Sequence, residues 1–332
     1  MKSHLTLFQA LFFLASLLAG FVAGYLWRSA QLPQPLFPIR ENSLEYTFIH
    51  PLLATGLGGQ ETPTADYISL AKEVGVFVDE QKARKALEDI SVYFINYKQN
   101  GSFGINLGAT YEPASLFKLM VMMEYLKEAD ADPAILSKNL TYSVDILKLV
   151  DARSQQAPSE LKIGGVYSVL DLINKMIISS DNGAFYTLTA NINKDRFKKM
   201  YTDLGLRFPD GKSTYTISAK DYSLFFRVLY NATYLSRENS EKALSILSKT
   251  TFRDGLAKNL PSKVLIAHKF GERVQKDAAQ NIESVELHDC GIIYAGNGPY
   301  LLCVMTHGKD FDLLSGIIGS ISKMVYSEVE SE

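Results

Sequence analysis

The sequence predicts an α+β fold, in which an antiparallel five-stranded sheet is flanked by helices and an all-helical lobe lies beside it. Three observations carry this prediction: two strand-length runs near residue 100, a long helical stretch up to about residue 221, and three further strand-length runs followed by a terminal amphipathic helix. The chain has 332 residues and is 47% hydrophobic, so it can bury a sizeable core.

Five runs of β-branched and aromatic residues have the length of strands. The first two, residues 90–97 and 103–107, are joined at Asn100-Gly101, a pair typical of hairpin turns. The last three are residues 264–270, 285–294 and 300–306, and Gly296-Asn297 is the expected two-residue turn between the second and third of them. Strands joined by such hairpins pair in antiparallel fashion.

Helical periodicity fills the sequence between these two groups of strands. It is clearest in residues 115–127, 168–178, 183–190 and 194–204, which we expect to form the helical lobe. Helix formers also precede the first strand, in residues 67–88, and an amphipathic helix is expected over residues 311–326.

The first thirty residues predict a membrane anchor. The run from Leu5 to Trp27 has no charged residue and has the length of a membrane-spanning helix. Because no A-x-A cleavage site follows it, we expect an uncleaved anchor over residues 1–28 rather than a signal peptide. Lys2 on one side and Arg28 with Arg40 on the other give little charge bias. We expect a single-pass protein of the cell membrane whose body is extracytoplasmic.

Prolines in residues 31–38 favour an extended stalk, and we interpret residues 29–66 as an extracytoplasmic linker whose second part docks on the body. The folded body is expected over residues 67–328.

The composition excludes several classes of function. The formal charge of −2 and the absence of a dense Lys/Arg block give no footprint for nucleic acid, so no nucleic-acid partner is expected. The two cysteines, Cys290 and Cys303, are too few for a disulfide scaffold, and no Cys/His cluster has the spacing of zinc ligands. No metal or cofactor is implied.

The turn at Gly296-Asn297 predicts that Cys290 lies directly opposite Cys303 on paired strands. Directly opposed Cβ atoms are about 4.5–5.5 Å apart, which is wide for a relaxed disulfide. We therefore favour a reduced, packed pair over a strained bridge, although export to an oxidising compartment would favour the bridge.

Ser115 and Lys118 have the spacing of a nucleophile and its base on one helix face. A serine hydroxyl needs a neighbouring base, and a lysine can serve when burial disfavours its ammonium form. The S-x-x-K pattern alone is weak, because Ser69/Lys72, Ser159/Lys162 and Ser320/Lys323 also match it. Only Ser115 follows Pro113-Ala114 after a strand hairpin and begins an apolar run, which predicts a buried helix N-terminus.

Two further motifs follow in order. Ser180-Asp181-Asn182 occurs once, after the apolar stretch 173–178, where a loop can present Ser180 and Asn182 to Lys118. Lys269-Phe270-Gly271 ends the strand 264–270, where a glycine lets a ligand approach the backbone. His268 should face the opposite side of that strand as a packed histidine.

The ordered set resembles the class A β-lactamases and penicillin-binding proteins over roughly residues 85–328. The resemblance implies a serine β-lactamase-like catalytic domain, with Ser115 attacking a carbonyl, Lys118 accepting its proton and Ser180 relaying a proton to the leaving nitrogen. It also implies that Asn182 and Lys269 orient the substrate, next to Gly271, and that the N–H groups of Ser115 and Glu272 form the oxyanion hole.

Three positions depart from this family. Phe270 replaces the hydroxyl of K-T-G that helps bind a substrate carboxylate, and Cys290 stands where class A enzymes often have arginine. The loop whose glutamate activates the deacylating water has no counterpart, since residues 204–215 contain only Asp210 as an acid.

We therefore expect a serine hydrolase that forms an acyl-enzyme with a β-lactam or a peptidoglycan D-Ala-D-Ala-like amide, with slow release. The alternative is an inert member of the same fold that acts as a surface binding module. The set of Ser115, Lys118, Ser180, Asn182 and Lys269 favours the enzyme.

Overall fold

A computed structural model of the protein describes residues 13–14, 16, 18–22, 39–41, 45–54, 67–99, 101–153, 159–209, 211 and 213–331. The chain divides into two compact units, residues 1–39 with 53–59 and residues 40–52 with 60–332. Most of the expected anchor and linker lies outside the described residues. Within the part that is described, no helix is both long and apolar enough to cross a membrane.

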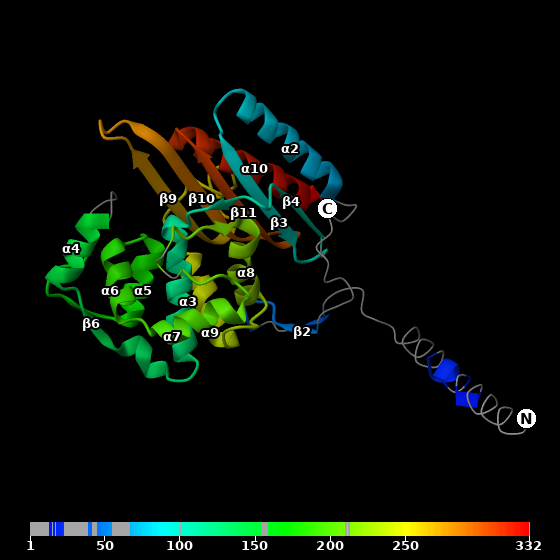
Figure 1. Ribbon diagram of the computed structural model, residues 1–332, viewed down its shortest axis with the longest axis horizontal. Coiled ribbons are helices and arrows are strands. Elements are labelled where there is room, and N and C mark those ends of the chain that lie inside the picture. The colour runs from blue at the N-terminus through cyan, green and yellow to red at the C-terminus, as the bar shows by residue number, and fades with distance from the viewer. Residues whose placement is uncertain are drawn as a thin grey trace, which may run out of the picture. The chain divides into compact units, whose positions relative to one another are not determined.

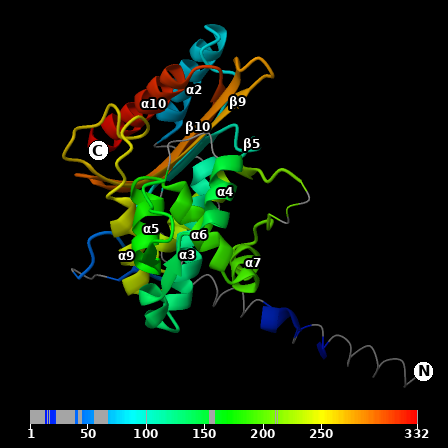
Figure 2. The ribbon, with the colours of Figure 1, turned by 90° about the vertical axis from the view of Figure 1, so that its left-hand side faces the viewer.

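The second unit is built on a five-stranded antiparallel sheet with the order β4-β3-β11-β10-β9. Its strands are β3 (Asp89–Asn96), β4 (Gly101–Ile105), β9 (Leu265–Lys276), β10 (Ile282–Ala295) and β11 (Gly298–Gly308). The α+β prediction is confirmed, because this sheet is covered by helices on both faces (Figures 1 and 2).

Successive side chains along each strand point to opposite faces of the sheet, so the hydrophobic core is divided into two parts, one on each face. Val92 and Phe94 belong to the core under α2 (Ile68–Ala83) and α10 (Phe311–Ser331), whereas Tyr93 and Ile95 belong to the core shared with the helical lobe. This period of two is what a sheet buried on both sides requires. Figure 1 shows α2 and α10 together on one face and the lobe on the other.

The helical lobe lies between β5 (Thr110–Tyr111) and β9 in the sequence. Its helices are α3 (Phe117–Ala129), α4 (Val144–Arg153), α5 (Val169–Ile178), α6 (Asn182–Asn191), α7 (Lys194–Asp203), α8 (Ala219–Tyr230) and α9 (Arg237–Leu247). Short elements join them: β5 (Thr110–Tyr111), η2 (Ala114–Leu116), η3 (Pro133–Ser137), β6 (Asn139–Thr141), β7 (Val166–Ser168) and β8 (Ile217–Ser218). Side-chain caps start several of these helices; the Ser168 and Ser218 hydroxyls, for example, accept from backbone N–H groups of α5 and α8.

The segment before the body docks on the lobe, as expected for the second part of the linker. The carboxylate of Glu241 in α9 accepts the backbone N–H groups of Thr47, Phe48 and Ile49 at 2.8–3.2 Å. The Tyr294 hydroxyl donates to the carbonyl of Phe48 at 2.9 Å. Nearby, β1 (Ile39–Arg40) and β2 (Leu52–Ala54) form a two-stranded sheet.

The predicted extents of β9, β10 and the closing helix were too short. β9 continues past its expected end to Lys276, and β10 begins earlier than expected, at Ile282. The added residues are mostly polar and exposed, so they show no apolar alternation from which a strand could be predicted. Their pairing across the hairpin forms these ends. The closing helix likewise runs to Ser331.

The predicted register of the cysteines is confirmed, but the expectation that they are reduced is wrong. Cys290 pairs with Cys303, and the two form a disulfide. Their Cα atoms are 3.9 Å apart across the paired strands. Both are fully buried in the core shared by the sheet and the lobe.

Candidate active site

Ser115 lies in a tight turn rather than on the first turn of an α-helix. It is the middle residue of η2, and α3 begins only at Phe117. Ala114, just before it, has a φ of +46°, a left-handed conformation that costs a non-glycine residue about 1–3 kcal/mol. Such strain is retained where the surroundings fix the backbone, and Ser115 itself is 8% exposed.

The turn is held by contacts from two distant elements. The carbonyl of Leu116 accepts the hydroxyl of Tyr222 in α8 at 3.1 Å. On the other side lies Gly271 of β9, where an added Cβ would be 2.6 Å from the carbonyl oxygen of Pro113 and 3.1 Å from the nitrogen of Leu116. The absence of a side chain at Gly271 therefore lets the nucleophile turn approach the strand. The sequence had suggested that this glycine makes room for a ligand.

Lys118 follows in the first turn of α3 and is 2% exposed. Its amine donates to the carbonyl of Ser180, to the Ser180 hydroxyl at 2.9 Å and to Oδ1 of Asn182 at 2.8 Å. Burial lowers the pKa of Lys118 to about 7, against the opposing effect of the nearby Asp181 charge. A large fraction of this amine is therefore neutral at physiological pH and able to accept a proton.

Ser180 lies at the tip between α5 and α6, as predicted, with a φ of +58°. Its hydroxyl accepts from two amines, that of Lys118 at 2.9 Å and that of Lys269 at 3.1 Å. One hydroxyl thus links both lysines, and it is itself buried at 7% exposure.

Lys269 is in the middle of β9 and not at its end, because the strand continues to Lys276. The side chain is fully buried, and its amine also donates to the carbonyl of Phe270 at 3.0 Å. Burial, with a contribution from the like charge of Lys118, holds the pKa of Lys269 well below its usual range. Its neighbour His268 faces Asp289, 2.9 Å away, which confirms the prediction of a packed histidine.

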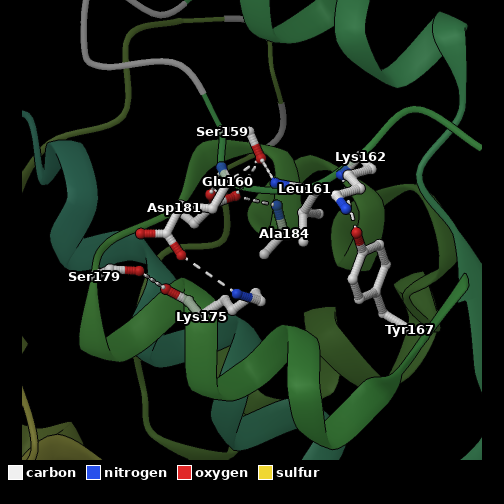
Figure 3. Close-up of polar contacts among 9 residues, drawn as sticks. All are labelled: Ser159, Glu160, Leu161, Lys162, Tyr167, Lys175, Ser179, Asp181 and Ala184. Atoms are coloured by element: carbon white, nitrogen blue, oxygen red, sulfur yellow. Dashed lines mark hydrogen bonds and ion pairs between the residues drawn. The ribbon is translucent and has the colours of Figure 1, made fainter. Parts of the chain in front are cut away.

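Asp181 is a structural residue of the site that the sequence reasoning did not single out. Its carboxylate caps α6 through the N–H of Ala184 at 2.7 Å, and it accepts the Ser159 hydroxyl at 2.8 Å and the N–H of Glu160 at 2.8 Å (Figure 3). These bonds fix the loop between Ser180 and Asn182. The signal was present, since Asp immediately before a helical segment is a preferred N-cap.

The expected site residues are thus only partly joined. Lys118, Ser180, Asn182 and Lys269 share hydrogen bonds, and Gly271 lies against Pro113 and Leu116, the residues of the turn on either side of Ala114 and Ser115. Among the described residues no hydrogen bond joins the Ser115 hydroxyl to Lys118. Glu272 follows on β9, opposite Leu287 of β10, with a half-buried side chain whose pKa is raised by burial.

This arrangement contains the parts that acyl transfer through a serine requires. A strained turn carries the hydroxyl, an amine with a lowered pKa follows one turn later, and a second buried amine is connected through Ser180. Catalytic hydrogen bonds are often loose without substrate and tighten when it binds.

Known proteins share this fold. A family model described as the β-lactamase enzyme family matches residues 70–329. Among solved structures, PBP-A is 21% identical with a TM-score of 0.68, over 82% of this chain and 100% of its own. A class A β-lactamase from Bacteroides cellulosilyticus is 18% identical with a TM-score of 0.63, over 79% of this chain and 99% of its own. No curated protein sequence matches the chain. The family match covers most of the chain, which therefore belongs to the β-lactamase enzyme family of serine hydrolases.

Proposed function

We propose that the protein forms an acyl-enzyme on Ser115 with a β-lactam or with a D-Ala-D-Ala-like amide of peptidoglycan, and that it releases the acyl group slowly. The observation that carries the proposal is the shared hydroxyl of Ser180, which joins the buried amines of Lys118 and Lys269. Lys118 follows Ser115 by three residues, and Lys269 precedes by two residues the glycine that packs on the nucleophile turn.

In the acylation step Lys118 accepts the proton of Ser115 while Oγ attacks the carbonyl carbon. The C–N bond of the amide breaks, and the leaving nitrogen receives a proton through Ser180. The acyl group is then bound to Oγ as an ester. In the second step water or an amine attacks this ester and restores the hydroxyl of Ser115.

Asn182 and Lys269 orient the substrate in this proposal, and the N–H groups of Ser115 and Glu272 stabilise the oxyanion. Asn182 is suited to this role because it is the first residue of α6, where its Oδ1 already accepts from Lys118 at 2.8 Å.

Slow release is supported by the sequence between Leu204 and Tyr215, which contains no glutamate and only Asp210 as an acid. Asp210 lies outside the described residues. A mutant of PBP-A, which has the same fold, has been crystallised as an acyl-enzyme with penicillin G, and this supports a penicillin as the first probe.

We further propose that residues 1–28 anchor the enzyme in the cell membrane with the catalytic domain outside the cytoplasm, where peptidoglycan lies. The uncharged run from Leu5 to Trp27 supports this. Fractionation of cells expressing the full chain, followed by protease accessibility of the body, tests it; a body found in the soluble fraction would contradict the anchor.

The function is tested by labelling residues 29–332 with a fluorescent penicillin and following label on the protein after excess unlabelled penicillin is added. We expect a covalent label that persists. The variants Ser115→Ala and Lys118→Ala should not be labelled, whereas Ser320→Ala, which alters an S-x-x-K serine in α10, should label like the parent. Absence of label on the parent would favour the inert binding module, and rapid loss of label would contradict slow release.

A further inference from the structure

The segment that leads into the nucleophile turn is bound to the sheet through Glu112, three residues before Ser115. The backbone carbonyl of Glu112 accepts from Nε2 of His288 in β10 at 3.1 Å. Its carboxylate pairs with Arg273 of β9 at 2.9 Å. Tyr111 adds a ring contact, because its ring centroid lies 5.4 Å from that of His288. Two strands of the sheet thus contact the chain just ahead of the nucleophile.

The tautomer of His288 is defined by its two hydrogen bonds. The residue is fully buried, and its Nδ1 accepts the backbone N–H of Thr306 in β11 at 3.2 Å. A ring nitrogen that accepts carries no proton, so the proton of the neutral ring is on Nε2, which donates to the carbonyl of Glu112. Burial lowers the pKa of His288 to about 4, so the ring stays neutral at physiological pH and retains both bonds.

The carbonyl of Glu112 sets the direction in which the chain enters the turn. It belongs to the planar peptide group that joins Glu112 to Pro113, and the proline ring fixes the next torsion, with a φ of −66°. Ala114 follows with its left-handed φ of +46°. The ion pair with Arg273 constrains this path less, because its side chains are 42% and 31% exposed and an exposed ion pair contributes little. The bond from His288 is made directly to the backbone from a buried ring.

We propose that His288 is a positioning residue of the acylation reaction, whose hydrogen bond to the carbonyl of Glu112 holds the turn that presents Ser115 to the acyl donor. Because the ring is fully buried and both of its nitrogens are bonded within the protein, it acts through Glu112 and does not contact the donor. This inference rests on the proposed acylation of Ser115. It adds a residue from β10, a strand that carries none of the three sequence motifs.

The two bonds of His288 can be separated by two variants of the full-length protein. In His288→Gln the amide N–H group extends about as far as Nε2 and can still donate to Glu112, but Thr306 loses its acceptor. In His288→Asn the amide oxygen lies about where Nδ1 was and can still accept from Thr306, but the shorter side chain does not reach Glu112. The rate of labelling by a fluorescent penicillin, measured over a range of concentrations, separates the limiting acylation rate from the concentration that gives half of it. His307→Asn is the matched control, because this histidine of β11 pairs with Glu88.

We expect His288→Asn to lower the limiting rate by about tenfold or more, since a displacement of about 1 Å in a reacting group costs on the order of 100-fold. The concentration at half the limiting rate should stay within about twofold of the parent, because His288 does not contact the donor. His288→Gln should recover the limiting rate to within about threefold of the parent, and His307→Asn should be labelled like the parent. Urea unfolding of each variant is measured in parallel, so that a rate lowered only by partial unfolding is recognised.

Labelling of His288→Asn as fast as His288→Gln would overturn the inference while leaving the acyl-enzyme intact, and so would a loss confined to the concentration at half the limiting rate. The parent gives a second test that needs no variant to fold. In its ¹⁵N NMR spectrum, Nε2 of His288 should carry the proton and Nδ1 should carry none between about pH 8 and about pH 5. A ring with a pKa near the ordinary value of 6.5, or with its proton on Nδ1, would also overturn it. If the parent is not labelled at all, the proposed function itself fails, and this inference fails with it.

Discussion

Replacing Gly271 with alanine tests whether the strand supports the nucleophile turn. The new Cβ would lie 2.6 Å from the carbonyl oxygen of Pro113 and 3.0 Å from Cγ of Leu116. To reach an ordinary contact of 3.4 Å the Pro113 carbonyl must recede by about 0.8 Å, and a displacement of about 1 Å in a reacting group costs on the order of 100-fold in rate. Overpacking of this kind also costs about 1–3 kcal/mol of stability.

The assay is the rate of labelling by a fluorescent penicillin, with urea unfolding measured in parallel. Gly316→Ala is the matched control, because an added Cβ there meets nothing within 4 Å, and alanine inside helix α10 should stabilise the protein by about 0.5–1 kcal/mol. We expect a folded but slowly labelled Gly271→Ala protein. If it is labelled as fast as Gly316→Ala, the close approach of β9 to the turn has no role in acylation.

Three further predictions concern other parts of the site. Because burial lowers the pKa of Lys118 to about 7, the neutral fraction of its amine grows as the pH rises through 7. Acylation should therefore accelerate between about pH 6 and about pH 8 and then level off. A rate that is flat over this range would contradict the role of Lys118 as the base. Asp181→Ala should cost about 1–3 kcal/mol of stability and slow acylation. The control Asn193→Ala removes only the cap of α7, so it should cost about 1 kcal/mol of stability and leave acylation unchanged. If the two variants are labelled equally fast, Asp181 does not position the site. Alkylation of the unfolded protein without reductant should modify neither Cys290 nor Cys303, and alkylation after reduction should modify both.

The sequence was sufficient for features that depend on neighbouring residues. Gly296-Asn297 defines a two-residue turn, and a turn of that length sets the register of β10 against β11 as far as Cys290 and Cys303. The spacing of Ser115 and Lys118 and the position of Ser180 between two apolar segments are equally local. The register of the cysteines and the position of Ser180 were found where predicted, whereas Ser115 lies in a 3-10 turn before the helix that the pattern predicted.

Features that depend on contacts between distant parts of the chain were missed. The approach of Gly271 to Pro113 joins residues more than 150 positions apart, and nothing near Gly271 in the sequence indicates it. The turn sets which residues face Cys290 and Cys303 but not whether their sulfurs are bonded, so the disulfide was missed. The ends of β9 and β10 are polar and exposed, so their strand structure comes from pairing with each other and carries no hydrophobic pattern.

The central claim is that Ser115 carries the acyl group, and peptide mapping of the benzylpenicillin-treated protein tests it most directly. After proteolysis, mass spectrometry with fragmentation should locate the adduct on the hydroxyl of Ser115, and Ser115→Ala should carry none. An adduct on another residue, such as Ser180, or an unmodified Ser115 peptide at full reagent excess, would contradict the account.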